Sequence, residues 1–227
     1  MSFPLISIFY LFFALMLFFF TWRTYRICKK SPSPLAEHFK SMAFFAGVGS
    51  LVYALTCIFF TDNSFALGIG NIIGETFYRI TFVYGITTFF YLTFPRISSK
   101  KVIKVGLIFA ILATISHIKF FPRPVIGESG IPISKPPIVP GITFALFSAA
   151  SLLPLSFAFA REAIKERRLR TKSGLMSSAL IFIMVSGGLQ SLARTPQLYI
   201  FTLVLSALAY ALLFSAAILQ VKEENRA

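Results

Sequence analysis

The sequence predicts an all-α integral membrane protein with seven transmembrane helices, and three observations support this fold class. Hydrophobic residues make up 56% of the 227 residues, charged residues only 13%, and the mean hydropathy is +0.79. Soluble domains are about 45–50% apolar and about 25% charged. The apolar residues form seven runs, most of about 20 residues, the length at which a helix spans about 30 Å of hydrocarbon. Basic residues cluster between the runs. We therefore expect one seven-helix domain, residues 1–227, embedded in the lipid bilayer of a cell membrane.

The runs place the predicted spans at residues 3–22, 41–61, 70–94, 102–121, 141–160, 174–192 and 197–221. No basic residue precedes the first run and no small-residue cleavage site follows it, which favours a retained helix over a signal peptide. Gly68-Ile69-Gly70 predicts a frayed start to the third helix. Pro154 predicts a kink in the fifth helix. The charged run that follows this helix is expected to extend it by about two turns.

The distribution of basic residues predicts the orientation. Most of the 22 Lys and Arg residues follow the first, third and fifth spans or lie in the tail. The other side holds only Lys119, Arg123, Lys135 and Arg194. The positive-inside rule then places the amino terminus outside and the carboxyl terminus inside. Because topology explains the net charge of +14, we expect no nucleic-acid partner.

The longest polar connection lies between the fourth and fifth spans. Within it, Val125-Ile126 and Ile131-Pro132-Ile133 flank a Gly-Glu-Ser-Gly turn, a pattern typical of a short β-hairpin. Proline confines such a hairpin to edge pairing. We expect a small extracytoplasmic hairpin over one mouth of the bundle.

Polar residues in the third span mark a candidate site. Asn71, Glu75, Tyr78 and Arg79 share one helix face, because their spacing is i, i+4 and i+7/i+8. Ionisable side chains within a membrane are costly and often functional. Polar groups at the same predicted depth complete the candidate ligand-binding set: Asn71, Glu75, Tyr78, Arg79, His117, Gln190 and Arg194.

Two interpretations of this set stay open. In the first, Glu75 and Arg79 form a structural ion pair that fixes helix packing, and Arg79 extends toward the outer surface. In the second, the polar groups line a ligand pocket that opens to the outside. For Gln190 alone, a hydrogen bond between helices is the favoured role.

Several functional classes lack the residues that their chemistry needs. Retinal requires a lysine in the seventh span, and residues 196–221 contain none. An intramembrane aspartyl protease needs two aspartates, and Asp62 is the only one. His38 and His117 are too few for a usual zinc site. We expect no enzyme activity, no metal and no cofactor.

The spacing of spans indicates an internal duplication. Spans one to three and spans five to seven share one order: span, long basic inner loop, span, short outer turn, span. The fourth span links them, which gives a 3+1+3 layout of the kind that parallel-repeat transporters use. This layout predicts a small-solute transporter with superposable halves and a homodimeric assembly.

The overall arrangement also resembles the seven-helix N-terminal sensor domain of bacterial membrane histidine kinases. The likeness lies in the external amino terminus, Lys29-Lys30-Ser31-Pro32, the span ending Tyr91 to Pro95, His117, and the long outer loop before the fifth span. The resemblance implies a sensor or receptor-like protein with an outward-facing polar pocket.

The predicted sensor needs an output. Such sensor domains feed an output domain, whereas this chain has only Lys222 to Ala227 after the seventh span. We therefore expect a separate cytoplasmic signalling partner. Its predicted docking site is residues 161–172, the charged run that begins with Arg161 and ends with Lys172. A topology signal is the competing interpretation of this run.

Overall fold

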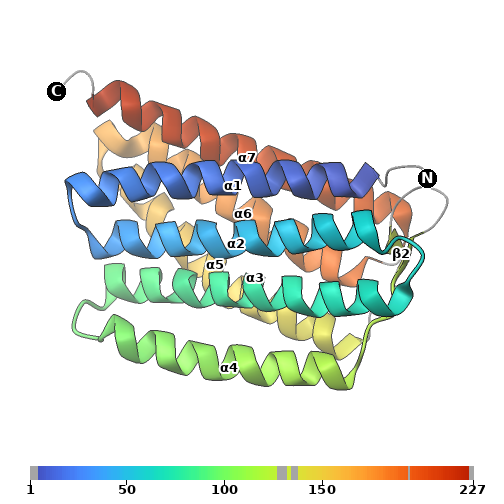
Figure 1. Ribbon diagram of the computed structural model, residues 1–227. Helices are drawn as coiled ribbons and strands as arrows, with labels where there is room; N and C mark the ends of the chain where they lie inside the picture. Colours follow the sequence, from blue (N-terminus) through green and yellow to red (C-terminus); the bar gives the residue numbers. More distant parts are fainter. Residues whose placement is uncertain (1–4, 127–131, 134–137, 194, 225–227) are drawn as a thin grey trace.

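The computed structural model describes residues 5–126, 132–133, 138–193 and 195–224, and these fold into an all-α bundle (Figure 1). The described residues form seven α-helices and one short 3-10 turn. They are α1 (Leu5–Lys30), α2 (Pro34–Phe59), α3 (Ser64–Thr93), α4 (Ser99–Lys119), α5 (Ile138–Lys165), η1 (Arg167–Leu169), α6 (Arg170–Leu192) and α7 (Pro196–Glu224). Six helices, all except α3, are long and apolar enough to cross a membrane. The chain is therefore a multi-pass membrane protein.

Helix α3 differs from the other six in composition rather than in length or position. It has 30 residues and runs beside α2 and α4 for the length of the bundle (Figure 1). Glu75, Arg79 and several threonines and tyrosines lower its hydropathy. Many of its residues are nonetheless buried, because α2, α4 and α5 pack around it. The helix that carries Glu75 and Arg79 thus has an enclosed place among three neighbours.

The predicted spans match the helices in number and order, but every described helix reaches beyond its predicted span at one end or both. Helix α1 continues past Trp22 to Lys30, and α2 already begins at Pro34, which occupies the first helical turn. Helix α5 continues to Lys165, as the charged run predicts. Hydropathy marks only the part of a helix within hydrocarbon, so it misses turns that extend into the headgroup region. Pro154 lies inside α5.

The predicted frayed start of the third helix is wrong. Helix α3 begins at Ser64, well before Gly68 and Gly70. The Asn63 side chain caps it by accepting hydrogen bonds from the backbone amides of Phe65 and Ala66 at 3.1 and 3.0 Å. Both glycines instead lie inside α3 at close contacts, Gly70 against Thr56 of α2.

The helices pack in sequence order around a common centre. Each described helix contacts the next, α3 also packs closely on α5, and α7 returns to touch α1. Helix α4 lies at the edge, against α3 and α5 (Figure 1). Two clusters of buried side chains fill the interior, one shared by α1, α2, α3 and α7 and the other by α2, α3, α5 and α6.

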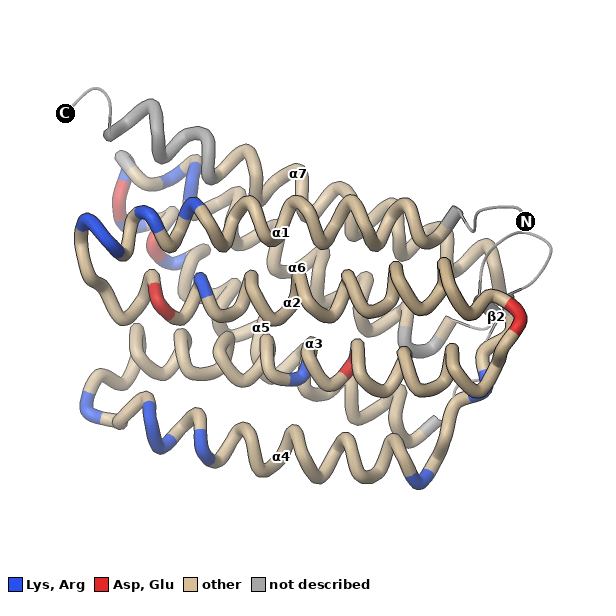
Figure 2. Tube along the Cα trace, in the orientation of Figure 1, with Lys and Arg blue, Asp and Glu red and all other residues tan. Residues whose placement is uncertain are grey.

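Charge divides the two ends of the bundle. Lys and Arg concentrate at the end where α1 finishes and α4 begins (Figure 2). One acidic and one basic residue, Glu75 and Arg79, stand apart part-way along α3 (Figure 2). We call the basic end the inner end and the opposite one the outer end.

A short strand pair lies at the outer end. Strand β1 (Val125–Ile126) pairs antiparallel with β2 (Pro132–Ile133), in the register Val125 with Ile133 and Ile126 with Pro132. These segments coincide with the predicted arms. The predicted Gly-Glu-Ser-Gly turn between them lies outside the described residues.

Candidate functional site

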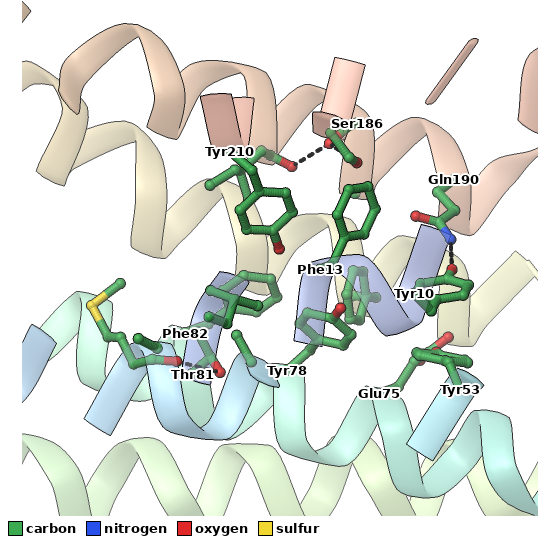
Figure 3. A pocket seen from close by; sticks show the side chains of 18 of the residues that line it. Tyr10, Phe13, Tyr53, Glu75, Tyr78, Thr81, Phe82, Ser186, Gln190 and Tyr210 are labelled. Carbon is green, nitrogen blue, oxygen red and sulfur yellow. Dashed lines mark hydrogen bonds between the residues drawn. The ribbon is translucent and has the colours of Figure 1, made fainter. Parts of the chain in front are cut away.

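A cavity of about 240 Å³ occupies the centre of the bundle. Residues of all seven helices line it, and the lining extends from Arg23 at the inner end to Pro122, Pro124 and Pro140 at the outer end. The lining is mostly apolar. Its polar groups gather toward the outer end, where Figure 3 shows Tyr10, Tyr53, Glu75 and Gln190 close together. We therefore distinguish an outer polar section from an inner apolar section.

Glu75 is the centre of a charged cluster beside the outer section. Arg79 donates a hydrogen bond from Nη2 to Glu75 Oε2 at 2.7 Å. His117 Nδ1 of α4 lies 3.1 Å from the same oxygen and 3.3 Å from Arg79 Nη2. With a proton on Nδ1 the ring donates to the carboxylate, and without one Nδ1 accepts from Arg79. Glu75 is thus held by one residue of its own helix and one of its neighbour.

Arg79 faces away from the cavity and is fully buried, with 0% of its side chain exposed. Its Nη1 lies 3.5 Å from Thr114 Oγ1 on α4, and Thr114 in turn lies 3.2 Å from Thr76 Oγ1. No partner for Nε is found among the described residues. The prediction that Arg79 extends to the outer surface is wrong, because Glu75, His117 and Thr114 draw its guanidinium between α3 and α4.

This cluster has a structural consequence for the site. A buried pair gains little over apolar packing, but removing one partner leaves an uncompensated charge, which costs about 3–5 kcal/mol. The contacts with His117 and Thr114 therefore fix α4 against α3. They also fix the carboxylate of Glu75 at the cavity wall, where its side chain is 13% exposed.

Hydroxyl groups form a second network across the outer section. Tyr10 of α1 and Tyr199 of α7 bring their hydroxyl oxygens to 2.9 Å. Gln190 of α6 donates from Nε2 to both hydroxyls, at 2.8 Å to Tyr199. The Tyr10 ring also stacks on Tyr53 of α2, with centroids 4.9 Å apart. These contacts join the two ends of the helix ring where α7 meets α1.

Two further polar contacts complete the outer section. Asn71 donates from Nδ2 to the Tyr53 hydroxyl at 3.4 Å. Tyr78 and Ser50 share a 2.7 Å hydrogen bond between α3 and α2. The groups exposed to the cavity are thus one carboxylate, one imidazole, two amides and several phenols. Arg79 already balances the charge of Glu75. The lining therefore suits hydrogen bonding to a small uncharged polar group better than binding of an ion.

The structure brings most of the predicted site residues to one place. Asn71, Glu75, Tyr78, His117 and Gln190 all line the cavity. Arg79 lies behind Glu75 and does not line it. Arg194 lies outside the described residues.

Sequence reasoning missed Tyr10, Tyr53 and Tyr199, which contribute most of the hydroxyl network. Each is a single tyrosine in a run of apolar residues, and a buried tyrosine usually finds a partner for its hydroxyl group. That rule could have selected them as inward-facing. The helix pairing that brings them together could not be read from the chain.

The described residues contain no group of three metal-binding side chains, and none of their serines or cysteines bonds to a histidine. Cys28 and Cys57 are both free and buried. The arrangement therefore presents hydrogen-bonding groups on a mostly apolar wall, the usual character of a small-molecule binding site.

Comparison of the chain with protein-family models, with curated proteins and with solved structures finds no match. The cavity and its lining therefore carry the functional argument.

Proposed function

We propose that this protein is a membrane sensor of receptor-like type that binds a small ligand in the outer polar section of its cavity. The observation that carries the proposal is the convergence of polar groups from separate helices on one enclosed space: Tyr10, Tyr53, Glu75, His117, Gln190 and Tyr199. A purely structural network would bury these groups against each other. Here they also face a cavity.

The lining specifies the class of ligand. Glu75 and Arg79 cancel each other's charge, so the outer section favours an uncharged hydrogen-bonding group over an anion. The surrounding aromatic rings favour an apolar body. Pockets for drug-sized ligands usually measure about 300–1,000 Å³, so about 240 Å³ supports a small or slender molecule.

The charge distribution supports the predicted orientation. With the basic end in the cytoplasm, the amino terminus lies outside and the outer section faces the exterior. The β1–β2 pair then lies extracytoplasmically, next to Pro122 and Pro124 at the cavity mouth. A ligand would reach the outer section beside this pair.

The output of the proposed sensor is a cytoplasmic partner. The run 161–172 contains the end of α5, the turn η1 and the start of α6, and its side chains are mostly exposed. Gln190 lies near the outer end of α6, and the last residues of the run form the inner end of the same helix. A ligand that shifts α6 through Gln190 would therefore move this run. The proposal involves binding and transmission, with no chemical reaction.

A thermal-shift screen tests the binding proposal. Purified protein in neutral detergent is screened against small aromatic and alicyclic alcohols and amides. We expect some compounds to raise the unfolding temperature of the wild type and to lose most of that effect in Tyr199→Phe and Gln190→Leu. Tyr84→Phe is the matched control, because Tyr84 lies in α3 but does not line the cavity. Shifts that persist equally in all variants would contradict the proposal.

One observation favours a second function, a small-solute transporter. Helices α1–α3 and α5–α7 form two groups of three linked by α4. The last helix of each group contacts the first helix of the other, α3 with α5 and α7 with α1. This arrangement supports the 3+1+3 layout that is typical of parallel-repeat transporters. Uptake of a screened ligand into liposomes containing the protein would favour transport, whereas saturable binding without uptake favours the sensor.

A further inference from the structure

The inner section of the cavity is bounded on one side by α1 and α7. Phe19 of α1 and Phe214 of α7 both line the cavity, yet they are 46% and 37% exposed. Their rings lie 6.2 Å apart, centroid to centroid. Side chains that face both the cavity and the surface form a thin wall between them. Because these helices are long and apolar enough to cross the bilayer, this wall faces lipid and not water.

The described residues of α1 and α7 pack on each other far more sparsely than those of α3 and α5, although the two pairs have equivalent places in the helix ring. The hydrogen bond between Tyr10 and Tyr199 joins α1 to α7 at the outer end. Toward the inner end, the described residues connect them through ring contacts such as Tyr210 on Phe13 and Phe214 on Phe19 and through the apolar packing of Leu17 and Leu213. Among the described residues, the seam is thus joined by a hydrogen bond at the outer end and by apolar contacts at the inner end.

Arg23 provides a charge at the inner end of this section. It lines the cavity, it is partly exposed, and no hydrogen bond or ion pair to it is found among the described residues. It directly follows the apolar run that ends at Trp22, so it lies where the hydrocarbon of the inner leaflet meets the headgroups. A guanidinium without an ion-pair partner at the membrane interface favours an anion, above all a carboxylate or a phosphate.

The length of the inner section along α1 matches the depth of one lipid leaflet. From Arg23 to Phe13 is ten residues of helix, or about 15 Å at about 1.5 Å per residue. One leaflet of hydrocarbon is also about 15 Å thick, half of about 30 Å. Between these two residues the wall is apolar, with Leu17 and Phe20 from α1 and Leu213 from α7.

We infer that the inner section binds a single-chain anionic amphiphile from the bilayer, with its headgroup on Arg23 and its chain in the apolar wall. The molecule enters through the α1–α7 seam. This site uses Arg23 and the α1–α7 seam, neither of which belongs to the outer polar section. Binding at the inner site therefore does not depend on the proposed outer ligand site. A fatty acid and a lysophospholipid share the required chemistry.

Saturable binding of radiolabelled oleate and of oleoyl lysophosphatidylglycerol to the purified full chain in dodecyl maltoside micelles tests the inference. We expect both or one of them to bind the wild type, and Arg23→Gln to weaken this binding about tenfold or more, because a charge-assisted contact is lost. Binding of oleate alone identifies the carboxylate as the preferred head, and binding of the lysophospholipid alone identifies the phosphate. Monoolein, with the same chain and no charge, should compete poorly.

Arg26→Gln is the matched control. Arg26 lies one turn further on, stacks over Trp22 at 4.8 Å and does not line the cavity. We expect this variant to bind as the wild type does. Equal weakening in both variants would overturn the inference in favour of general attraction to the basic end, and the absence of saturable binding to the wild type would overturn it as well.

A second variant addresses the seam without changing charge. Leu213→Trp narrows the inner section, and we expect it to weaken binding of the amphiphile while leaving the compound-induced shifts of the outer section unchanged. Amphiphile binding to Leu213→Trp that equals wild-type binding would contradict the inference. If the wild type shows the outer-site shifts but does not bind the amphiphile, only the inference is rejected. Loss of the outer-site shifts alone would reject only the proposed sensor site.

Discussion

The two three-helix halves of the bundle share a layout but are held together by different contacts. In the first half, glycines let α2 and α3 approach closely: a Cβ atom at Gly49 would lie 3.0 Å from the Gly74 carbonyl oxygen, and one at Gly74 would lie 2.8 Å from the Tyr53 ring. In the second half, Cβ atoms at Gly187 and Gly188 would meet α5 at ordinary distances of 3.7 and 3.9 Å. Close approach through glycine therefore belongs to α1–α3, although α5 packs on α6 as extensively as α1 packs on α2.

In the second half, hydroxyl contacts join helices that have no close glycine contact, whereas the first half has both kinds of contact. Ser156 of α5 lies 3.1 Å from Ser177 of α6, and Ser206 of α7 donates to Ser186 of α6 at 3.0 Å. Charges follow the same division, since residues 138–160, 173–193 and 195–221 contain no Asp, Glu, Lys or Arg. The difference indicates a first half fixed by close glycine contacts and the charged cluster, and a second half whose helices are joined by apolar packing and hydroxyl contacts. A sensor needs such a contrast, because a ligand can shift only a part that has two arrangements of similar energy.

The largest expected effect comes from breaking the charged cluster. Glu75→Leu leaves Arg79 buried without its carboxylate and should lower the free energy of unfolding by about 3–5 kcal/mol. The double variant Glu75→Leu/Arg79→Met removes both charges and should recover most of this loss. Unfolding in detergent, followed by circular dichroism, measures both. A double variant as unstable as the single one would show that the charges are not coupled.

A smaller effect should separate the two halves directly. Gly70→Ala places a methyl group against Thr56 of α2 and should cost about 1–3 kcal/mol, because neither backbone can retreat easily. Gly188→Ala has Ala145 of α5 at 3.9 Å and should stabilise the protein by about 0.5–1 kcal/mol through helix propensity.

The same unfolding measurement tests this pair of substitutions. Equal costs at Gly70 and Gly188 would remove the distinction between a first half with close glycine contacts and a second half without them.

The fold class could be predicted from the sequence because hydrophobicity and length decide it. Seven apolar runs give seven helices, and an apolar run in a bilayer has few alternatives to a helix. Helix ends could not be predicted equally well. The start of α3 depends on one capping side chain, Asn63, and on tertiary contacts at Gly68 and Gly70. Two glycines close together in the sequence suggest that a helix end frays. Only the packing of Gly70 on Thr56 of α2 shows that they lie inside a continuous helix.

The candidate site shows the same limit. Spacing alone placed Asn71, Glu75 and Tyr78 on one face, and all three line the cavity. The direction of Arg79 could not be read from spacing, because it depends on His117 and Thr114 of α4. The hydroxyl network was missed for a related reason: its members come from helices distant in sequence.

The smallest expected effect concerns the hydroxyl contacts of the second half. Ser206→Ala removes the hydrogen bond to Ser186 and should cost only about 0.6 kcal/mol, since hydrogen bonds between membrane helices are weak when the separated partners find other acceptors. Ser186 already has such an acceptor, because its hydroxyl group also donates to the Ile183 carbonyl at 3.1 Å. A double-mutant cycle with Ser186→Ala isolates the pair. A coupling well above this value would mean that α6 is fixed as firmly on α7 as α2 is on α3, and the proposed movement of α6 through Gln190 would then lack a flexible element.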